Sequence, residues 1–295
     1  MSSIHLRGFV YCEPATIDET VSLLNEFGSG SKIMAGGIDL IPRMREGSVN
    51  ADYVVNIRNI PELTYFSCSE KAGLEFGAMT TLQYLDESRE LKENYPIIRD
   101  AIHQITSVQT KYMGTAVGNL CVATPGSDIA PALIAYDAEM IIAGINGARR
   151  EKLYKFYPGK GSTSLQAGEF VTGVFVPKPA KGTGAVFMNK VRTHADIAKI
   201  TLSVVVTVDG DTYKDARIAL GAVAPTAVRA EKSEAMLRNR KISAELIREA
   251  SEAVTESINP SSGLRSTKEY RTEVTPVLVR RALEEATEYA RRAVQ

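Results

Sequence analysis

The chain has 295 residues, with Lys plus Arg and Asp plus Glu balanced at 35 each. A chain of this length can bury a sizeable core, in one large domain or in two to three smaller ones. Because it carries no net charge, it has no global field to attract nucleic acid or an anionic membrane, and we expect neither partner.

The N-terminal stretch "MSSIHLRGFVYCEPATIDET" lacks a basic start followed by an apolar signal segment, and no later apolar run is long enough for a membrane span. We therefore expect a cytoplasmic protein without a membrane span. The three cysteines, Cys12, Cys68 and Cys121, have no CxxC spacing. This argues against a disulfide framework, a zinc site or an iron–sulfur cluster held by this chain alone.

The first 58 residues predict a small α/β unit. In "ATIDETVSLLNEFGSG", Thr16 and Glu19 have capping-box spacing and Gly28 is a plausible helix terminator. A short strand over 32–35 runs into Gly36 and Gly37, a helical turn follows over 39–45, and a buried strand is expected over 52–57.

From residue 59 the pattern shifts to short strands, such as the one over 74–79, and to helices. Thr80 and Thr81 are placed to cap a helix that begins at "TLQYLDESREL", and another helix is expected over about 97–105. We predict that residues 1–177 form one two-part domain, with subdomains over about 1–58 and 59–177.

A Pro-, Gly- and Lys-rich link over 176–184 is followed by a different sequence pattern. "KITLSVVVTV" alternates with the period of a strand, and Asp209-Gly210 predicts a hairpin turn after it. Two amphipathic helices are expected, one after Ser243 and one from about Val274. Strands followed by helices predict an α+β domain over 178–295. The residues expected on inward faces are Ile200, Leu202, Val204, Val206 and Val208 in the strand, and Leu246, Ile247, Ala250, Val254, Ile258, Val277, Leu278, Ala282 and Leu283 in the helices.

Two glycine-bearing loops could carry chemistry. At Gly36-Gly37 the missing side chains would let a phosphate approach the backbone N–H groups, although such a dipeptide is more often an ordinary tight turn. The second loop, "GTAVGNLCVATPGSDIAP", combines glycines with small hydrogen-bonding side chains. Within it, Asp128 could accept hydrogen bonds from sugar or ribityl hydroxyls, or could simply cap the next helix. The GxGxxG fingerprint and the phosphate loop ending in GKS or GKT are absent.

The sequence contains few motifs of catalytic residues. His5, His103 and His194 are isolated in sequence, and neither HExxH nor GxSxG occurs, so metal-dependent hydrolysis and triad chemistry have little support. The charged group Lys190, Arg192 and Asp196 is typical of a solvated strand end.

The motifs together resemble a known family, the FAD-binding medium subunits of molybdenum hydroxylases, as in bacterial carbon monoxide dehydrogenase and the flavin domain of xanthine dehydrogenase. "KIMAGGIDL" resembles the first FAD loop, "FGAMTTLQYL" a middle element, "GTAVGNLCVATPGSDIAPAL" the second FAD loop, and "NKVRTHADIAKITLSVV" the start of the C-terminal domain. "DARIALGAVAPTAVRAEKSEAML" and "GLRSTKEYRTEVTPVLVRRALEEA" are similar to the rest of it. The resemblance implies an α+β fold: an FAD-binding domain of the PCMH, or vanillyl-alcohol-oxidase-like, type followed by an antiparallel sheet with helices.

The resemblance also implies site residues for FAD. The first loop would wrap the pyrophosphate and adenosine part with Lys32, Ile33, Met34, Ala35, Gly36, Gly37, Ile38, Asp39 and Leu40. Thr115, Gly118 and Asn119 would form a second clamp, and Asp128 would bind ribityl or nearby sugar hydroxyls. Ile105 and Val171 would be apolar neighbours of the flavin, Lys190 would sit near the isoalloxazine ring, and Thr80 is a weaker assignment.

Three positions depart from the family's usual pattern. Ile38 stands where relatives often have Thr, His or Gln, Lys111 replaces an arginine, and Val117 replaces the first glycine of "GTIGGN". We expect FAD to be retained, with weaker binding if these contacts matter.

The resemblance implies that substrate oxidation takes place at a molybdenum cofactor in a large partner subunit. Electrons would pass through two 2Fe–2S clusters of a small partner subunit to FAD on this chain, and then to NAD, a quinone or another carrier. The assembly implied is a heterotrimer that pairs into a dimer of heterotrimers. Three alternatives stay open: a self-contained FAD oxidase, a flavin-free interaction subunit of the same fold, and a NAD-dependent dehydrogenase with a nonstandard glycine loop.

Overall fold

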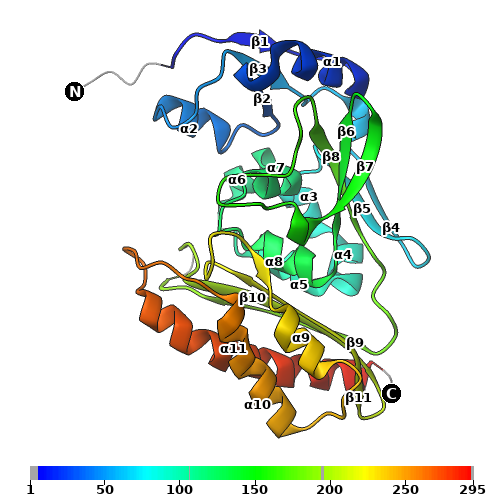
Figure 1. The fold of residues 1–295 in the computed structure, drawn as a ribbon. Helices are drawn as coiled ribbons and strands as arrows, with labels where there is room; N and C mark the ends of the chain where they lie inside the picture. Colours follow the sequence, from blue (N-terminus) through cyan, green and yellow to red (C-terminus); the bar gives the residue numbers. More distant parts are fainter. Residues whose placement is uncertain (1–5, 106, 194–195, 294–295) are drawn as a thin grey trace.

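The computed structural model describes residues 6–105, 107–193 and 196–293. Figure 1 shows three regions stacked along the molecule, each built around its own sheet: an N-terminal unit, a middle region and a C-terminal region. His5 and His194 lie outside the described residues.

The N-terminal unit is the expected α/β element. Its parallel sheet has the order β1-β3-β2, and its elements are β1 (Val10–Cys12), α1 (Ile17–Phe27), β2 (Ser31–Met34), α2 (Leu40–Arg45) and β3 (Tyr53–Asn56). The predicted cap is confirmed, because Thr16 Oγ1 accepts a hydrogen bond from the Glu19 N–H at 3.1 Å. The Glu19 carboxylate reaches back to the N–H of Ala15, and Gly28 ends the helix with φ of 54°.

The middle region has a five-stranded antiparallel sheet in the order β4-β5-β8-β6-β7, with short helices beside it. The strands are β4 (Phe66–Ser69), β5 (Gly73–Gly77), β6 (Glu139–Gly144), β7 (Gly147–Lys152) and β8 (Phe170–Val176). The helices are α3 (Leu82–Glu87), α4 (Arg89–Asn94), α5 (Pro96–His103), α6 (Val108–Met113), α7 (Ala116–Cys121) and α8 (Ile129–Ala135). Of the two threonines expected to cap α3, Thr81 does so, accepting from the Tyr84 N–H.

The C-terminal region is a four-stranded antiparallel sheet in the order β12-β11-β10-β9, covered by helices. Its elements are β9 (Thr183–Lys190), β10 (Ile200–Asp209), β11 (Thr212–Gly221), β12 (Val228–Arg229), α9 (Glu231–Leu237), α10 (Ala244–Ala253) and α11 (Lys268–Arg292). The hairpin predicted at Asp209-Gly210 is confirmed, because Asp209 pairs with Thr212 across it and Gly210 has φ of 55°.

Strand β10 is buried on both faces. The predicted inward face packs in the C-terminal core beneath α11, while Val205 on the other face packs in the core of the middle region, where α8 contacts the strand. In Figure 1 the sheet accordingly lies between α11 and α8. The sheet therefore joins the C-terminal region to the part of the chain that carries the second glycine-bearing loop.

The inward face expected for the last helix is partly wrong. α11 begins at Lys268 rather than near Val274, and Val277 is 39% exposed. The buried face instead contains Thr275, Val279, Ala282, Leu283, Ala286 and Ala290. Over 6–105, 107–193 and 196–293, no helix combines the length and apolar character that a membrane crossing needs.

Candidate functional site

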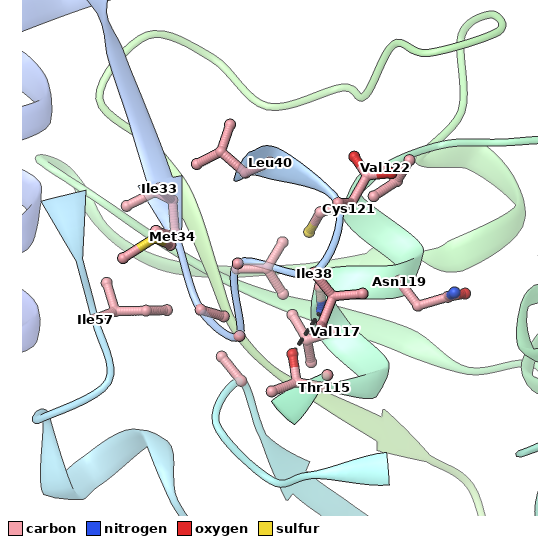
Figure 2. Close-up of a pocket in the computed structure, with 18 of the residues that line it drawn as sticks. Ile33, Met34, Ile38, Leu40, Ile57, Thr115, Val117, Asn119, Cys121 and Val122 are labelled. Carbon is pink, nitrogen blue, oxygen red and sulfur yellow. Dashed lines mark hydrogen bonds between the residues drawn. The ribbon is translucent and has the colours of Figure 1, made fainter. Parts of the chain in front are cut away.

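The two glycine-bearing loops meet at one cavity of about 440 Å³, which we call the first cavity. Figure 2 shows the β2–α2 loop facing α7 across it, with Ile38 near Val117 and Thr115. Thirteen of the residues predicted from the sequence line it: Ile33, Met34, Ala35, Gly36, Gly37, Ile38, Asp39, Leu40, Ile105, Thr115, Gly118, Asn119 and Val171.

Gly36 and Gly37 are needed for different reasons. A Cβ added at Gly36 would overlap the carbonyl oxygen of Met113 and lie 2.7 Å from its carbonyl carbon, so the bare backbone lets the two loops touch. Gly37 has φ of 72°, a conformation that other residues rarely adopt. Among the described residues, no protein acceptor takes a hydrogen bond from the N–H groups of Gly36, Gly37, Ile38 or Asp39. The first loop therefore presents free backbone donors beside the cavity.

The second loop is held by its own caps. Gly114 ends α6 by donating to the Thr110 carbonyl at 2.7 Å, and Thr115 Oγ1 caps α7 by accepting from the Gly118 N–H at 3.0 Å. Val117 lies within α7 and has no positive φ, so the replacement of the family's glycine strains nothing. Asn119 Oδ1 accepts from Ser127 Oγ at 2.6 Å, which fixes the side-chain amide at the cavity wall.

The rest of the first cavity is mainly apolar. Ile57, Ile105, Leu165, Phe170 and Val171 contribute side chains from four separate segments. Cys121 also lines the cavity, and burial raises the pKa of its thiol to about 12, which favours the neutral thiol there. The cavity thus combines backbone donors at residues 36–39, which we call the neck, with the apolar residues Ile57, Ile105, Leu165, Phe170 and Val171, which we call the apolar chamber.

Four predicted residues lie outside the lining of the first cavity. Lys32 Nζ donates to the Ser29 carbonyl, and the buried Thr80 hydroxyl donates to the Tyr65 carbonyl at 2.7 Å. Lys190 is exposed at the end of β9. Asp128 precedes α8 without capping it, because Ser127 Oγ accepts from the Ala130 N–H instead.

Asp128 connects the middle region to the C-terminal sheet. Its Oδ1 accepts from the Thr201 hydroxyl on β10 at 2.7 Å. Burial raises the pKa of Asp128, and the hydrogen bond from Thr201 offsets only part of that rise. A carboxyl whose pKa is higher in the folded state binds its proton more tightly there. The stability it contributes is present below the unfolded pKa of about 3.9 and is lost as pH rises through the folded pKa.

We expect Asp128→Asn to be at least as stable as the parent chain at pH 7, with the difference closing as pH falls toward about 4. The amide oxygen can still accept from Thr201, and the cost of a buried charge is gone. Thermal unfolding between pH 4 and 7 measures this, and a variant less stable at pH 7 would contradict it. A loss of FAD affinity without a loss of stability would support the implied contact with sugar hydroxyls.

Lys111, the second departure, is a buried cation behind the second loop. Its Nζ donates to Asp86 Oδ2 at 2.5 Å, and both side chains are less than a tenth exposed. Arg99 and His103 also reach the Asp86 carboxylate, at 3.3 and 3.2 Å. The ion pair ties α6 to α3 immediately before Gly114, so Lys111 supports the loop from outside the cavity.

A second cavity of about 820 Å³ adjoins the first and has no counterpart in the sequence predictions. The two share Asp39, Arg43, Val122 and Thr124 in their linings, so these residues form the wall between neighbouring cavities. Arg43 lies four residues after Asp39 and forms an ion pair with it at 3.2 Å. This helical spacing could have identified Arg43 from the sequence as a neighbour of the first loop. The residues that line this cavity from the C-terminal region, such as Arg265 and Arg271, belong to no sequence motif that would have predicted this position.

Comparisons with known proteins agree with this geometry. The family described as "FAD binding domain in molybdopterin dehydrogenase" matches residues 5–179, and the one described as "CO dehydrogenase flavoprotein C-terminal domain" matches residues 185–286. The chain belongs to the FAD-binding medium subunits of molybdenum hydroxylases. The carbon monoxide dehydrogenase medium chain of Hydrogenophaga pseudoflava is 32% identical to it, over 94% of this chain and 96% of the relative.

Other relatives of this medium-subunit family have different names. A xanthine dehydrogenase FAD-binding subunit of Escherichia coli is 27% identical over 94% of this chain and 95% of its own length. A solved carbon monoxide dehydrogenase from Hydrogenophaga pseudoflava, which lacks the Mo-pyranopterin moiety of the molybdenum cofactor, superposes with a TM-score of 0.92. It shares 32% identity, over 97% of this chain and 99% of the solved chain. The chain is therefore an oxidoreductase subunit with an FAD-binding domain.

Proposed function

We propose that this chain is the electron-transfer subunit of a heteromeric molybdenum hydroxylase, with FAD bound along the first cavity and into the second. The observation that carries this proposal is the meeting of the two loops, which places unpaired backbone donors at the neck of an apolar chamber. Dinucleotide diphosphates are commonly bound by such donors with little help from lysine. The apolar end suits a planar aromatic ring.

The residues present fit FAD in size and chemistry. Small side chains and glycines surround the neck, so a diphosphate can approach the backbone closely, and Thr115 and Gly118 line the same cavity from the second loop. Bound FAD supplies an electron carrier that accepts and releases one or two electrons. Ile57, Ile105 and Val171 would exclude water from the ring that they surround.

The departure at Ile38 fits the same arrangement. Ile38 is 43% exposed at the cavity and contributes its backbone N–H rather than a polar side chain. The contacts predicted for Lys32, Thr80, Asp128 and Lys190 are not needed for the neck, and they stay predictions.

The proposal also covers the type of FAD-binding domain, the partner subunits and the path of the electrons. The FAD-binding part would be of the PCMH type. The molybdenum cofactor would lie on a large partner subunit and the two 2Fe–2S clusters on a small one, with electrons leaving this chain's FAD for NAD, a quinone or another carrier. Pairing of two heterotrimers and a cytoplasmic location stay predictions. Relatives that are named as medium chains of dehydrogenases support this division of roles among subunits.

The visible spectrum of the purified chain tests the proposal, both alone and coexpressed with the proposed large and small partner subunits. We expect FAD near one per chain, identified by chromatography after acid release, and reduction of that FAD when a substrate is supplied to the assembled complex. A complex that assembles without flavin would favour the flavin-free interaction subunit. FAD that is reduced by a substrate in the isolated chain would favour the self-contained oxidase.

A further inference from the structure

The second cavity has a basic wall. Four basic side chains and one acidic side chain line it: Arg43, Lys160, Arg265, Arg271 and Asp39. Asp39 is paired with Arg43 on the N-terminal side. The other three cations come from the middle region and from the C-terminal region, in the loop before α11 and in its first turn.

Arg265 and Arg271 are short of anionic partners. Arg271 Nη1 donates to the carbonyl of Ala222 at 2.9 Å, but its Nε is buried without a hydrogen-bond partner among the described residues. Arg265 reaches a single described carboxylate, that of Asp196, at 3.7 Å, and Asp196 is also bound by Arg192 at 3.3 Å.

The two guanidinium groups also act on each other. Burial lowers the pKa of Arg271 below its ordinary value, and the nearby charge of Arg265 lowers it further. Two cations lining one cavity, with a buried donor left over, cost free energy that an anion between them would offset.

We propose that Arg265 and Arg271 form an anion site in the second cavity for the phosphate groups of a dinucleotide. The planar guanidinium fork matches phosphate oxygens, and Lys160 adds a third cation to the same cavity. Asn259 and Ser261 add neutral hydrogen-bonding groups to the lining. A cavity of about 820 Å³ is large enough for part of a dinucleotide rather than for a lone ion.

Two sources can supply this phosphate, and both rest on the proposed function. One is FAD itself, if one of its two phosphates stays at the neck of the first cavity and the other reaches past Asp39 and Arg43. The other is a soluble dinucleotide, such as a nicotinamide dinucleotide, that takes electrons from the flavin.

The primary experiment measures binding of inorganic pyrophosphate to the full chain freed of flavin, by calorimetry at low salt. We expect Arg265→Gln to weaken binding about tenfold, since a charge-assisted hydrogen bond is lost, and Arg265→Lys to restore part of the affinity. The matched control is Arg248→Gln on α10. Arg248 is 54% exposed against 50% for Arg265, and it pairs only with Glu252 among the described carboxylates.

Affinities for FAD and for reduced nicotinamide dinucleotide then identify the source. Weaker FAD binding by Arg265→Gln assigns the site to the FAD diphosphate. Unchanged FAD binding with weaker nicotinamide dinucleotide binding to the FAD-loaded chain assigns it to the acceptor. Equal pyrophosphate affinity in Arg265→Gln and the parent chain overturns the anion site, and an effect on pyrophosphate but on neither dinucleotide overturns the dinucleotide assignment. Because the pyrophosphate measurement needs no flavin, it remains decisive even if the chain binds no FAD.

Discussion

Gly36→Ala is expected to lower the affinity of the chain for FAD roughly tenfold, with the overall fold kept. The added Cβ overlaps the Met113 carbonyl oxygen, which is backbone and cannot rotate away. The two loops must separate, and under the proposed function the backbone donors at the neck would then no longer converge on one diphosphate. Overpacking at one contact costs about 1 to 3 kcal/mol of unfolding free energy. FAD titration of the flavin-free chain and thermal unfolding measure the two effects.

Two other glycines supply graded controls. Gly37→Ala imposes left-handed strain of roughly 1 to 2 kcal/mol, but its Cβ would make only ordinary contacts, the nearest at 3.4 Å to Ile41. Gly8→Ala has nothing within 4 Å. We expect FAD to bind most tightly to Gly8→Ala, less tightly to Gly37→Ala and least tightly to Gly36→Ala. If Gly36→Ala bound FAD as the parent chain does, the contact between the loops would not shape the site.

The elements were predictable where the signal is local. The cap at Thr16, the turn at Asp209-Gly210 and the alternation along β10 depend on residues within one turn or one strand. The same local view placed Val277 on the wrong face of α11. The face that α11 buries is set by how it lies on β9 and β10, which the helix's own sequence records only weakly.

The first cavity was largely predictable, because the resemblance supplied its two loops. The physical reason for a glycine at position 36 was not predictable. The sequence alone suggested that Gly36 makes space for a ligand, whereas in the structure it makes space for the backbone of Met113, 77 positions later. The carboxylate of Asp128 likewise meets Thr201, 73 positions away. Arg265 and Arg271 line the second cavity together with Arg43 and Lys160, which lie more than 100 positions earlier in the chain. Long-range packing of this kind leaves no spacing or periodicity to detect.

Lys111→Met is expected to destabilise the chain by about 3 kcal/mol, because it leaves the buried carboxylate of Asp86 without its closest partner. Arg99 and His103 remain near that carboxylate, which keeps the loss at the lower end of the range for buried ion pairs. FAD affinity should fall as well, since α6 leads directly into Gly114. Thermal unfolding and FAD titration measure both changes.

The pH dependence of the stability difference between the parent chain and Lys111→Met shows whether the lost ion pair with Asp86 causes it. Burial alone would raise the pKa of Asp86, but hydrogen bonds from Lys111 and His103 outweigh it and lower the pKa below its ordinary value. The stability from this group is therefore present above the unfolded pKa of about 3.9 and is lost as pH falls through the folded pKa. The parent chain and Lys111→Met should differ most above about pH 5 and converge in acid. Lys111→Arg keeps the charge and should stay close to the parent chain, while Lys92→Met removes an exposed lysine from α4. A Lys111→Met chain as stable as Lys92→Met would show that the ion pair does not hold the loop.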